Sequence, residues 1–192
     1  MPATKAQCAR PDSRLTSPAE TAADTAELLF SALGELHGLA VADSDLLRRA
    51  SGGMRYIQSV GAYTDLEHEL FCIALAELPV ADAFVVEASA CYAADVAMTA
   101  QAQWRRAGFS ARRRAMWLAA ILRLADELSS RGGARPDGAC AVWNDDTLYL
   151  EFDGSAIAED RLARAQSRVA ALEAVTGRRV MLASSAARRG AA

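Results

Sequence analysis

The chain has 192 residues, of which 52% are hydrophobic and 23% charged, a balance that excludes a disordered protein and allows one domain with an appended lobe. Its formal net charge of −3 at pH 7 excludes a generally basic surface, so any anion binding must come from a local cluster of arginines. No signal-peptide pattern and no membrane-spanning apolar run are found in the sequence, so we expect a cytoplasmic protein without membrane contact.

Four cysteines and two histidines are the residues best suited to bind a soft metal ion: Cys8, Cys72, Cys91, Cys140, His37 and His68. The cysteines are widely spaced and include no C-x-x-C pair, which argues against both a zinc site and a disulfide framework. We therefore expect reduced thiols, no metal and no other cofactor.

Apolar spacing predicts a bundle of five helices in residues 18–132. The helices are expected to begin near Ala19, Asp43 or Ser44, Asp65, Ala81 and Ser110. The first should end at Gly38, and the fourth should run unbroken to Arg106. In the third, the apolar residues assigned to the buried face are Leu66, Leu70, Ile73 and Leu78. Two glycines in the second, Gly52 and Gly53, indicate close approach of another backbone.

The last of these helices is the most regular, with a broad apolar face over residues 117–131 and a stop at Gly132. Asp126 falls on the flank of that face, where an acid can serve as a ligand or as a partner. Its spacing favours an ion pair with Arg123, three residues earlier.

The rest of the chain predicts a smaller lobe and two tails. Residues 1–17 lack apolar periodicity and are expected to be disordered, as is the tail 184–192. Between them, residues 133–183 predict a hairpin, one helix and a last strand, a ββαβ lobe packed on the bundle. The fold class is therefore mainly α, with a small α+β lobe.

Four segments, in this order, resemble the C-terminal part of exopolyphosphatases and guanosine pentaphosphate phosphohydrolases, the Ppx/GppA family: residues 36–39, 46–50, 118–126 and 175–180. The resemblance extends over about residues 20–182. It implies an HD-like helical domain followed by a small α/β lobe. In that family the phosphatase chemistry belongs to a preceding actin-like domain, for which this chain has no room.

The resemblance also implies that a metal site of the HD type is degenerate. The His-Asp position of HD phosphohydrolases is matched here by Met54 and Arg55, a thioether and a positive charge. Of the later ligand positions, only His68 and Asp126 match, and two ligands hold a catalytic ion poorly. We therefore expect no catalytic residues, and if any catalysis remains it would use Asp126 and His68, with Glu67 or Glu69.

Five arginines surround Gly108: Arg105, Arg106, Arg112, Arg113 and Arg114. Positive charge in the first turn of a helix is unfavourable by roughly 0.3–1 kcal/mol per residue, so the last three require compensation. A bound polyanion would supply it, and so would nearby acids on a solvated face. Because Phe109 is the one aromatic residue between these arginines and the chain is acidic overall, a phosphate chain is favoured over nucleic acid.

These observations predict a stand-alone accessory or regulatory module that binds polyphosphate or guanosine polyphosphate, or that docks on a catalytic phosphatase partner. Two alternatives remain open. The chain could be a divergent phosphohydrolase of the exopolyphosphatase type, or a module for assembly as a homodimer.

Overall fold

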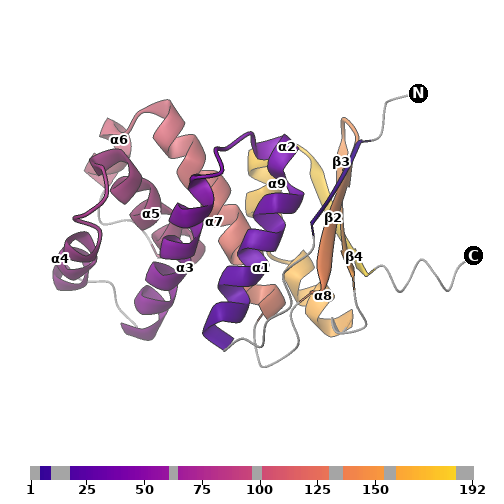
Figure 1. Cartoon of the computed structure of the whole chain (residues 1–192), viewed down its shortest axis with the longest axis horizontal. Helices are drawn as coiled ribbons and strands as arrows, with labels where there is room; N and C mark the ends of the chain where they lie inside the picture. Colours follow the sequence, from indigo (N-terminus) through magenta and orange to yellow (C-terminus); the bar gives the residue numbers. More distant parts are fainter. Residues whose placement is uncertain are drawn as a thin grey trace, which may run out of the picture. The chain divides into compact units, whose positions relative to one another are not determined.

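A computed structural model describes residues 5–9, 18–60, 65–96, 101–129, 136–153 and 159–184. The fold is mainly helical with a small α+β part, as the sequence predicted, but within the described residues the sheet is mixed and has four strands instead of three (Figure 1). No helix in these ranges is long and apolar enough to cross a membrane.

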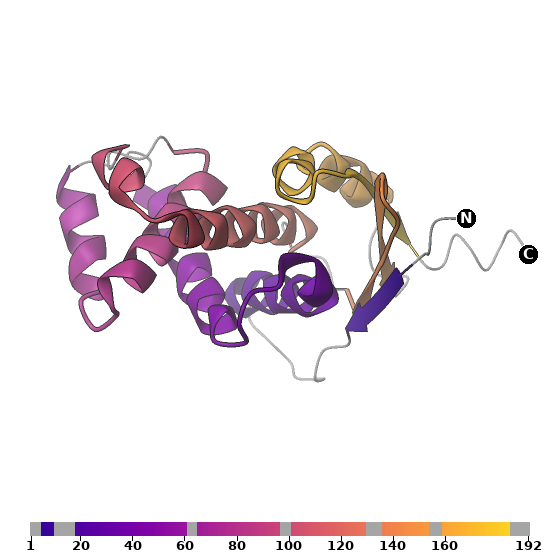
Figure 2. The same ribbon diagram turned by 90° about the horizontal axis from the view of Figure 1, so that it is seen from above.

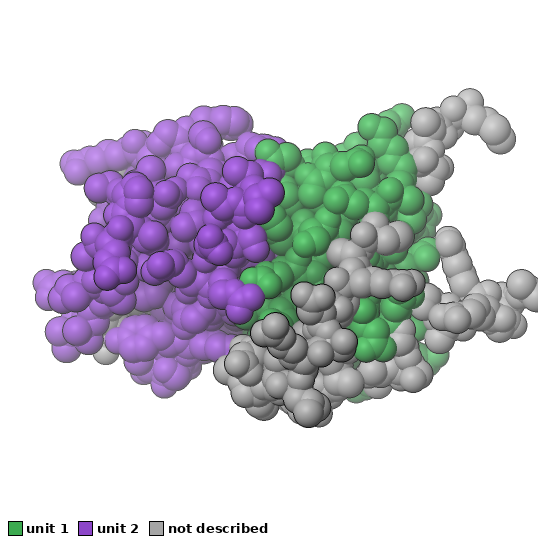
Figure 3. All heavy atoms as spheres, viewed as in Figure 1, with its two compact units in different colours: residues 1–38, 124–192 green, residues 39–123 purple. Residues whose placement is uncertain are grey.

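The chain forms two compact units, one of residues 1–38 with 124–192 and the other of residues 39–123 (Figure 3). We call them the sheet unit and the helical unit. The sequence predicted one helical domain that ends at residue 132. Instead, the first predicted helix and the end of the last one belong to the unit that contains the sheet. The long helix α7 (Phe109–Ser129) contributes to both units, which divide it between Arg123 and Leu124.

The sheet unit is built on four strands in the order β1-β2-β3-β4. Their bounds are Lys5–Ala9, Gly138–Trp143, Thr147–Asp153 and Arg179–Ser184. The first two pairings are antiparallel and the last is parallel. The predicted hairpin and final strand are confirmed, but β1 lies in the arm that was predicted to be disordered. Its partner is β2, at the far end of the sequence, so no local pattern reveals the pairing.

Helices cover one face of this sheet, namely α1 (Pro18–Ala32), α2 (Gly34–His37), α8 (Glu159–Gln166) and α9 (Ala170–Thr176) (Figure 2). Along β3, Leu148, Leu150 and Phe152 are fully buried while Tyr149 is exposed, the alternation expected of a strand with one covered face. The single helix predicted after the hairpin is in fact the pair α8 and α9. The predicted stop at Gly38 is confirmed, since Gly38 caps α2 with a left-handed φ of 57°.

The expectation that all cysteines are reduced thiols is wrong for the sheet unit. Cys140 on β2 is disulfide-bonded, although the spacing of the cysteines had suggested reduced thiols. In the register of β1 with β2, the residue opposite Cys140 is Cys8. In the helical unit, Cys72 and Cys91 are free.

The helical unit contains α3 (Asp43–Val60), α4 (Asp65–Ala74), α5 (Val80–Ala93), α6 (Gln101–Arg106) and the first part of α7. The fourth predicted helix is therefore wrong as one element. It divides into α5 and α6, and α5 ends just before Asp95, which adopts a left-handed φ of 58°.

Helix α4 packs through a different face from the one predicted. Phe71 and Leu75 are buried, whereas Leu66, Leu70 and Ile73 are 62%, 50% and 70% exposed. Both the buried pair and the exposed residues recur at helical spacing, so periodicity alone could not show which face of α4 is buried. The close approach of another backbone predicted at the two glycines is wrong: a Cβ at Gly53 would lie 2.4 Å from the Phe71 side-chain ring, and a Cβ at Gly52 would have nothing within 4 Å.

Candidate functional site

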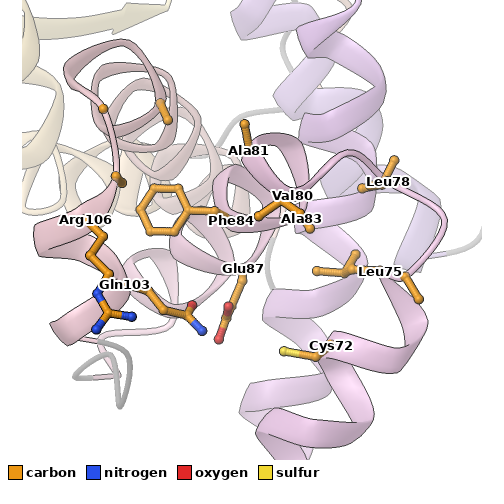
Figure 4. Close-up of a pocket in the computed structure, with 14 residues that line it drawn as sticks. Cys72, Leu75, Leu78, Val80, Ala81, Ala83, Phe84, Glu87, Gln103 and Arg106 are labelled. Carbon is orange, nitrogen blue, oxygen red and sulfur yellow. The ribbon is translucent and has the colours of Figure 1, made fainter.

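A pocket of about 700 Å³ opens in the helical unit between α4, α5, α6 and the start of α7 (Figure 4). This volume is within the range of small-molecule sites. Most of the lining is apolar, from Leu75, Leu78, Val80, Ala81, Ala83, Phe84, Ala107 and Ala111. Such a surface would receive an apolar or aromatic group.

The polar groups of the pocket gather at one end. In Figure 4 the Arg106 guanidinium, the Gln103 amide and the Glu87 carboxylate lie together below the Phe84 ring. Helix α6 holds Gln103 and Arg106 there because the Trp104 ring packs 5.8 Å from Phe84 and 5.1 Å from Tyr92, both on α5. The pocket is thus amphipathic, with an apolar body and a polar end that contains a cation, Arg106, and a carboxylate, Glu87.

Beside the pocket, α4 and α5 bring together His68, Cys72 and Glu87. The Nδ1 atom of His68 lies 2.6 Å from Oε1 of Glu87, and its Nε2 atom lies 3.6 Å from Sγ of Cys72. Glu87 is buried, with 4% of its surface exposed, whereas Cys72 is exposed and lines the pocket together with Glu87. An imidazole, a thiol and a carboxylate therefore converge at the pocket wall.

The environment of Cys72 does not favour a free thiolate. Burial raises the pKa of the Cys72 thiol, and the negative charges of Glu87 and Glu69 raise it further. A cysteine nucleophile needs the opposite shift, toward the thiolate. The raised pKa therefore argues against Cys72 as a catalytic nucleophile.

The arginine cluster predicted from the sequence separates into residues with different surroundings. Arg105, Arg106 and Arg113 are exposed, and Arg112 and Arg114 are partly buried. Of the five, Arg106 lines the pocket. The other four arginines therefore lie outside the lining of this pocket.

Arg114 has two acidic partners. Its guanidinium lies 2.6 Å from Asp43 at the start of α3 and 2.8 Å from Asp82 in the first turn of α5. Although burial alone would lower the pKa of Arg114, hydrogen bonds and charge attraction to the two carboxylates raise it overall. These acids supply the compensation that the sequence left open, so Arg114 has a structural role.

The residues predicted for any remaining catalysis belong to different compact units. His68 belongs to the helical unit and Asp126, half-buried on α7, belongs to the sheet unit. Arg123, the expected partner of Asp126, forms an ion pair with Asp95. Glu69 is exposed, and the Glu67 side chain lies outside the described parts of the structure.

Sequence reasoning missed Cys72 and Glu87 and expected no set of metal ligands. One signal was available, since His68 and Cys72 are four residues apart and so share a helix face. Glu87 could not be found in this way, because its position depends on how α5 packs against α4.

No protein-family model and no curated protein matches this chain. The resemblance to the Ppx/GppA family thus rests on the four sequence segments described above. Function must be inferred from the residues and their arrangement.

Proposed function

We propose that this chain is a binding or regulatory module whose pocket in the helical unit holds a phosphorylated ligand with an apolar or aromatic body. The observation that carries the proposal is the position of Arg106, the one cation among the described residues of the lining, at the polar end of a mostly apolar pocket. A guanidinium group pairs well with phosphate oxygens. The Phe84 ring provides a surface on which a base can stack.

Among the ligands that the family resemblance implies, this geometry favours guanosine polyphosphate over inorganic polyphosphate. A polyphosphate chain has no apolar part to fill the pocket, and Arg114 already has carboxylate partners. A guanosine nucleotide has both a base and a run of phosphates. The HD-like arrangement that the same resemblance implies for residues 18–132 is part of the proposal, with α1 to α7 as its helices.

Isothermal titration of guanosine pentaphosphate into the full chain tests this function. We expect saturable binding that weakens about tenfold in Arg106→Gln, the cost of one charged hydrogen-bonding group. Arg105→Gln is the matched control, because Arg105 is an exposed neighbour on α6 that does not line the pocket. Its effect should be much smaller.

Two results would contradict the proposal. One is the absence of saturable binding at low salt. The other is an equal loss in Arg105→Gln and Arg106→Gln, which would indicate a diffuse charged surface. The same samples should release no phosphate, and steady release would favour the alternative of a divergent phosphohydrolase.

Assembly is a second candidate function, favoured by the apolar face of α4. Leu66, Leu70 and Ile73 lie on successive turns of this helix, and each is at least half exposed. Burying such a stripe against a second copy would remove apolar surface from water. Light scattering should show a homodimer that dissociates in Leu70→Glu, and a wild-type monomer at high concentration would exclude this function.

A further inference from the structure

We propose that His68, Cys72 and Glu87 form a binding site for a divalent transition metal ion of the zinc class. This goes beyond the phosphate-ligand function and does not depend on it. One ligand atom from each residue can be chosen so that all three lie within 4.8 Å of one another. Imidazole nitrogen, thiolate sulfur and carboxylate oxygen are the donors that zinc binds in proteins.

Two helices fix the three donors. His68 and Cys72 are one helical turn apart on α4, so their side chains project from the same face. Glu87 comes from α5, which packs against α4, and its carboxylate is 2.6 Å from the His68 ring. Figure 4 shows the Cys72 sulfur extending from α4 toward the side on which the Glu87 carboxylate lies.

The electrostatics of the cluster also favour a cation. Glu87 is buried, and a buried carboxylate is costly unless positive charge balances it. The charge of His68 depends on its protonation, whereas a divalent ion would supply a permanent positive charge. A divalent ion held by these three residues would pair with the Glu87 carboxylate and would deprotonate a coordinating thiol.

The donor set selects the class of ion. Magnesium and calcium prefer sites made wholly of oxygen ligands, whereas thiolate and imidazole suit zinc and its neighbours. Three protein ligands leave one position of a tetrahedral site open. Because Cys72 and Glu87 both line the pocket, that position would face the pocket and could take water or a ligand atom.

The test is titration of the full chain, free of any histidine tag, with Zn²⁺ and with Co²⁺ as a spectroscopic substitute. We expect one ion per chain and a Co²⁺ spectrum with a thiolate charge-transfer band. That band should disappear in Cys72→Ser, and His68→Ala should weaken Zn²⁺ binding about tenfold or more. Glu77→Gln is the control, because Glu77 is an exposed acid that follows α4 and lies outside the cluster, and it should bind Zn²⁺ as wild type does.

Cys72 is exposed, so Cys72→Ser tests the site without disturbing the core, and circular dichroism will show that the variant is folded. The proposal is overturned if wild type binds no stoichiometric Zn²⁺, or if Cys72→Ser and His68→Ala bind it as tightly as wild type. A Co²⁺ complex without a thiolate band would overturn it as well. A second readout is protection, since bound Zn²⁺ should slow alkylation of Cys72.

Discussion

The guanidinium of Arg114 lies 2.6 Å from the carboxylate of Asp43, an acid that is almost fully buried at the start of α3. The other oxygen of that carboxylate accepts a hydrogen bond from the backbone N–H of Ala40. Through Asp82, the same guanidinium also reaches the first turn of α5. One arginine therefore joins the beginnings of three helices in the helical unit.

Replacing Arg114 should destabilise the helical unit. In Arg114→Ala the buried Asp43 carboxylate loses its cation, so we expect the free energy of unfolding to fall by about 1–3 kcal/mol. Arg113→Ala, at the exposed neighbouring position, should change it by no more than about 0.5 kcal/mol. Urea denaturation of both variants measures the difference, and equal losses would show that the ion pairs add nothing.

Adjacent glycines in α3 should respond with opposite signs to the same substitution. A Cβ at Gly53 would lie 2.4 Å from the Phe71 ring, so Gly53→Ala should cost about 1–3 kcal/mol of stability through overpacking. Nothing lies within 4 Å of a Cβ at Gly52, so Gly52→Ala should gain about 0.5–1 kcal/mol of helix propensity. Thermal unfolding will rank the variants, and a stabilised Gly53→Ala would contradict the packing described here.

The thiol of Cys72 should react slowly with iodoacetamide at neutral pH. Only the thiolate reacts, and burial together with Glu87 and Glu69 raises the pKa of Cys72. Removing one of these charges in Glu69→Gln should lower that pKa, so the alkylation rate should rise at a lower pH than in wild type. Mass spectrometry of the Cys72 peptide across a pH series measures this shift, and identical profiles would exclude an effect of Glu69.

Local patterns in the sequence were enough to predict much of the fold. Alternation along residues 147–152 predicted β3, and Gly38 predicted the end of the first helical segment. The strand β1 was missed because it is short and its partner β2 is distant in sequence. The break after α5 was missed because its left-handed residue, Asp95, is not a glycine.

The candidate site was less predictable, because it depends on which side chains the packing brings together. The sequence placed Arg106 and Arg114 in the same predicted phosphate-binding cluster. In the structure, Arg106 lines the pocket, whereas Arg114 forms an ion pair with Asp43. Sequence reasoning named His68 but gave it Asp126 as a partner, whereas the structure gives it Cys72 and Glu87. Tertiary contacts decide whether an acid such as Glu87, on a largely apolar helix, is buried.

The most direct test of the central claim, that the pocket of the helical unit is a ligand site, is backbone NMR of the full chain during titration with guanosine pentaphosphate. We predict that the largest shifts fall on the pocket residues of α5, α6 and the start of α7, such as Phe84, Gln103 and Ala111. In Arg106→Gln the same residues should shift, but a higher ligand concentration should be needed to reach saturation. Shifts confined to the sheet unit, or no shifts at saturating ligand, would contradict the account.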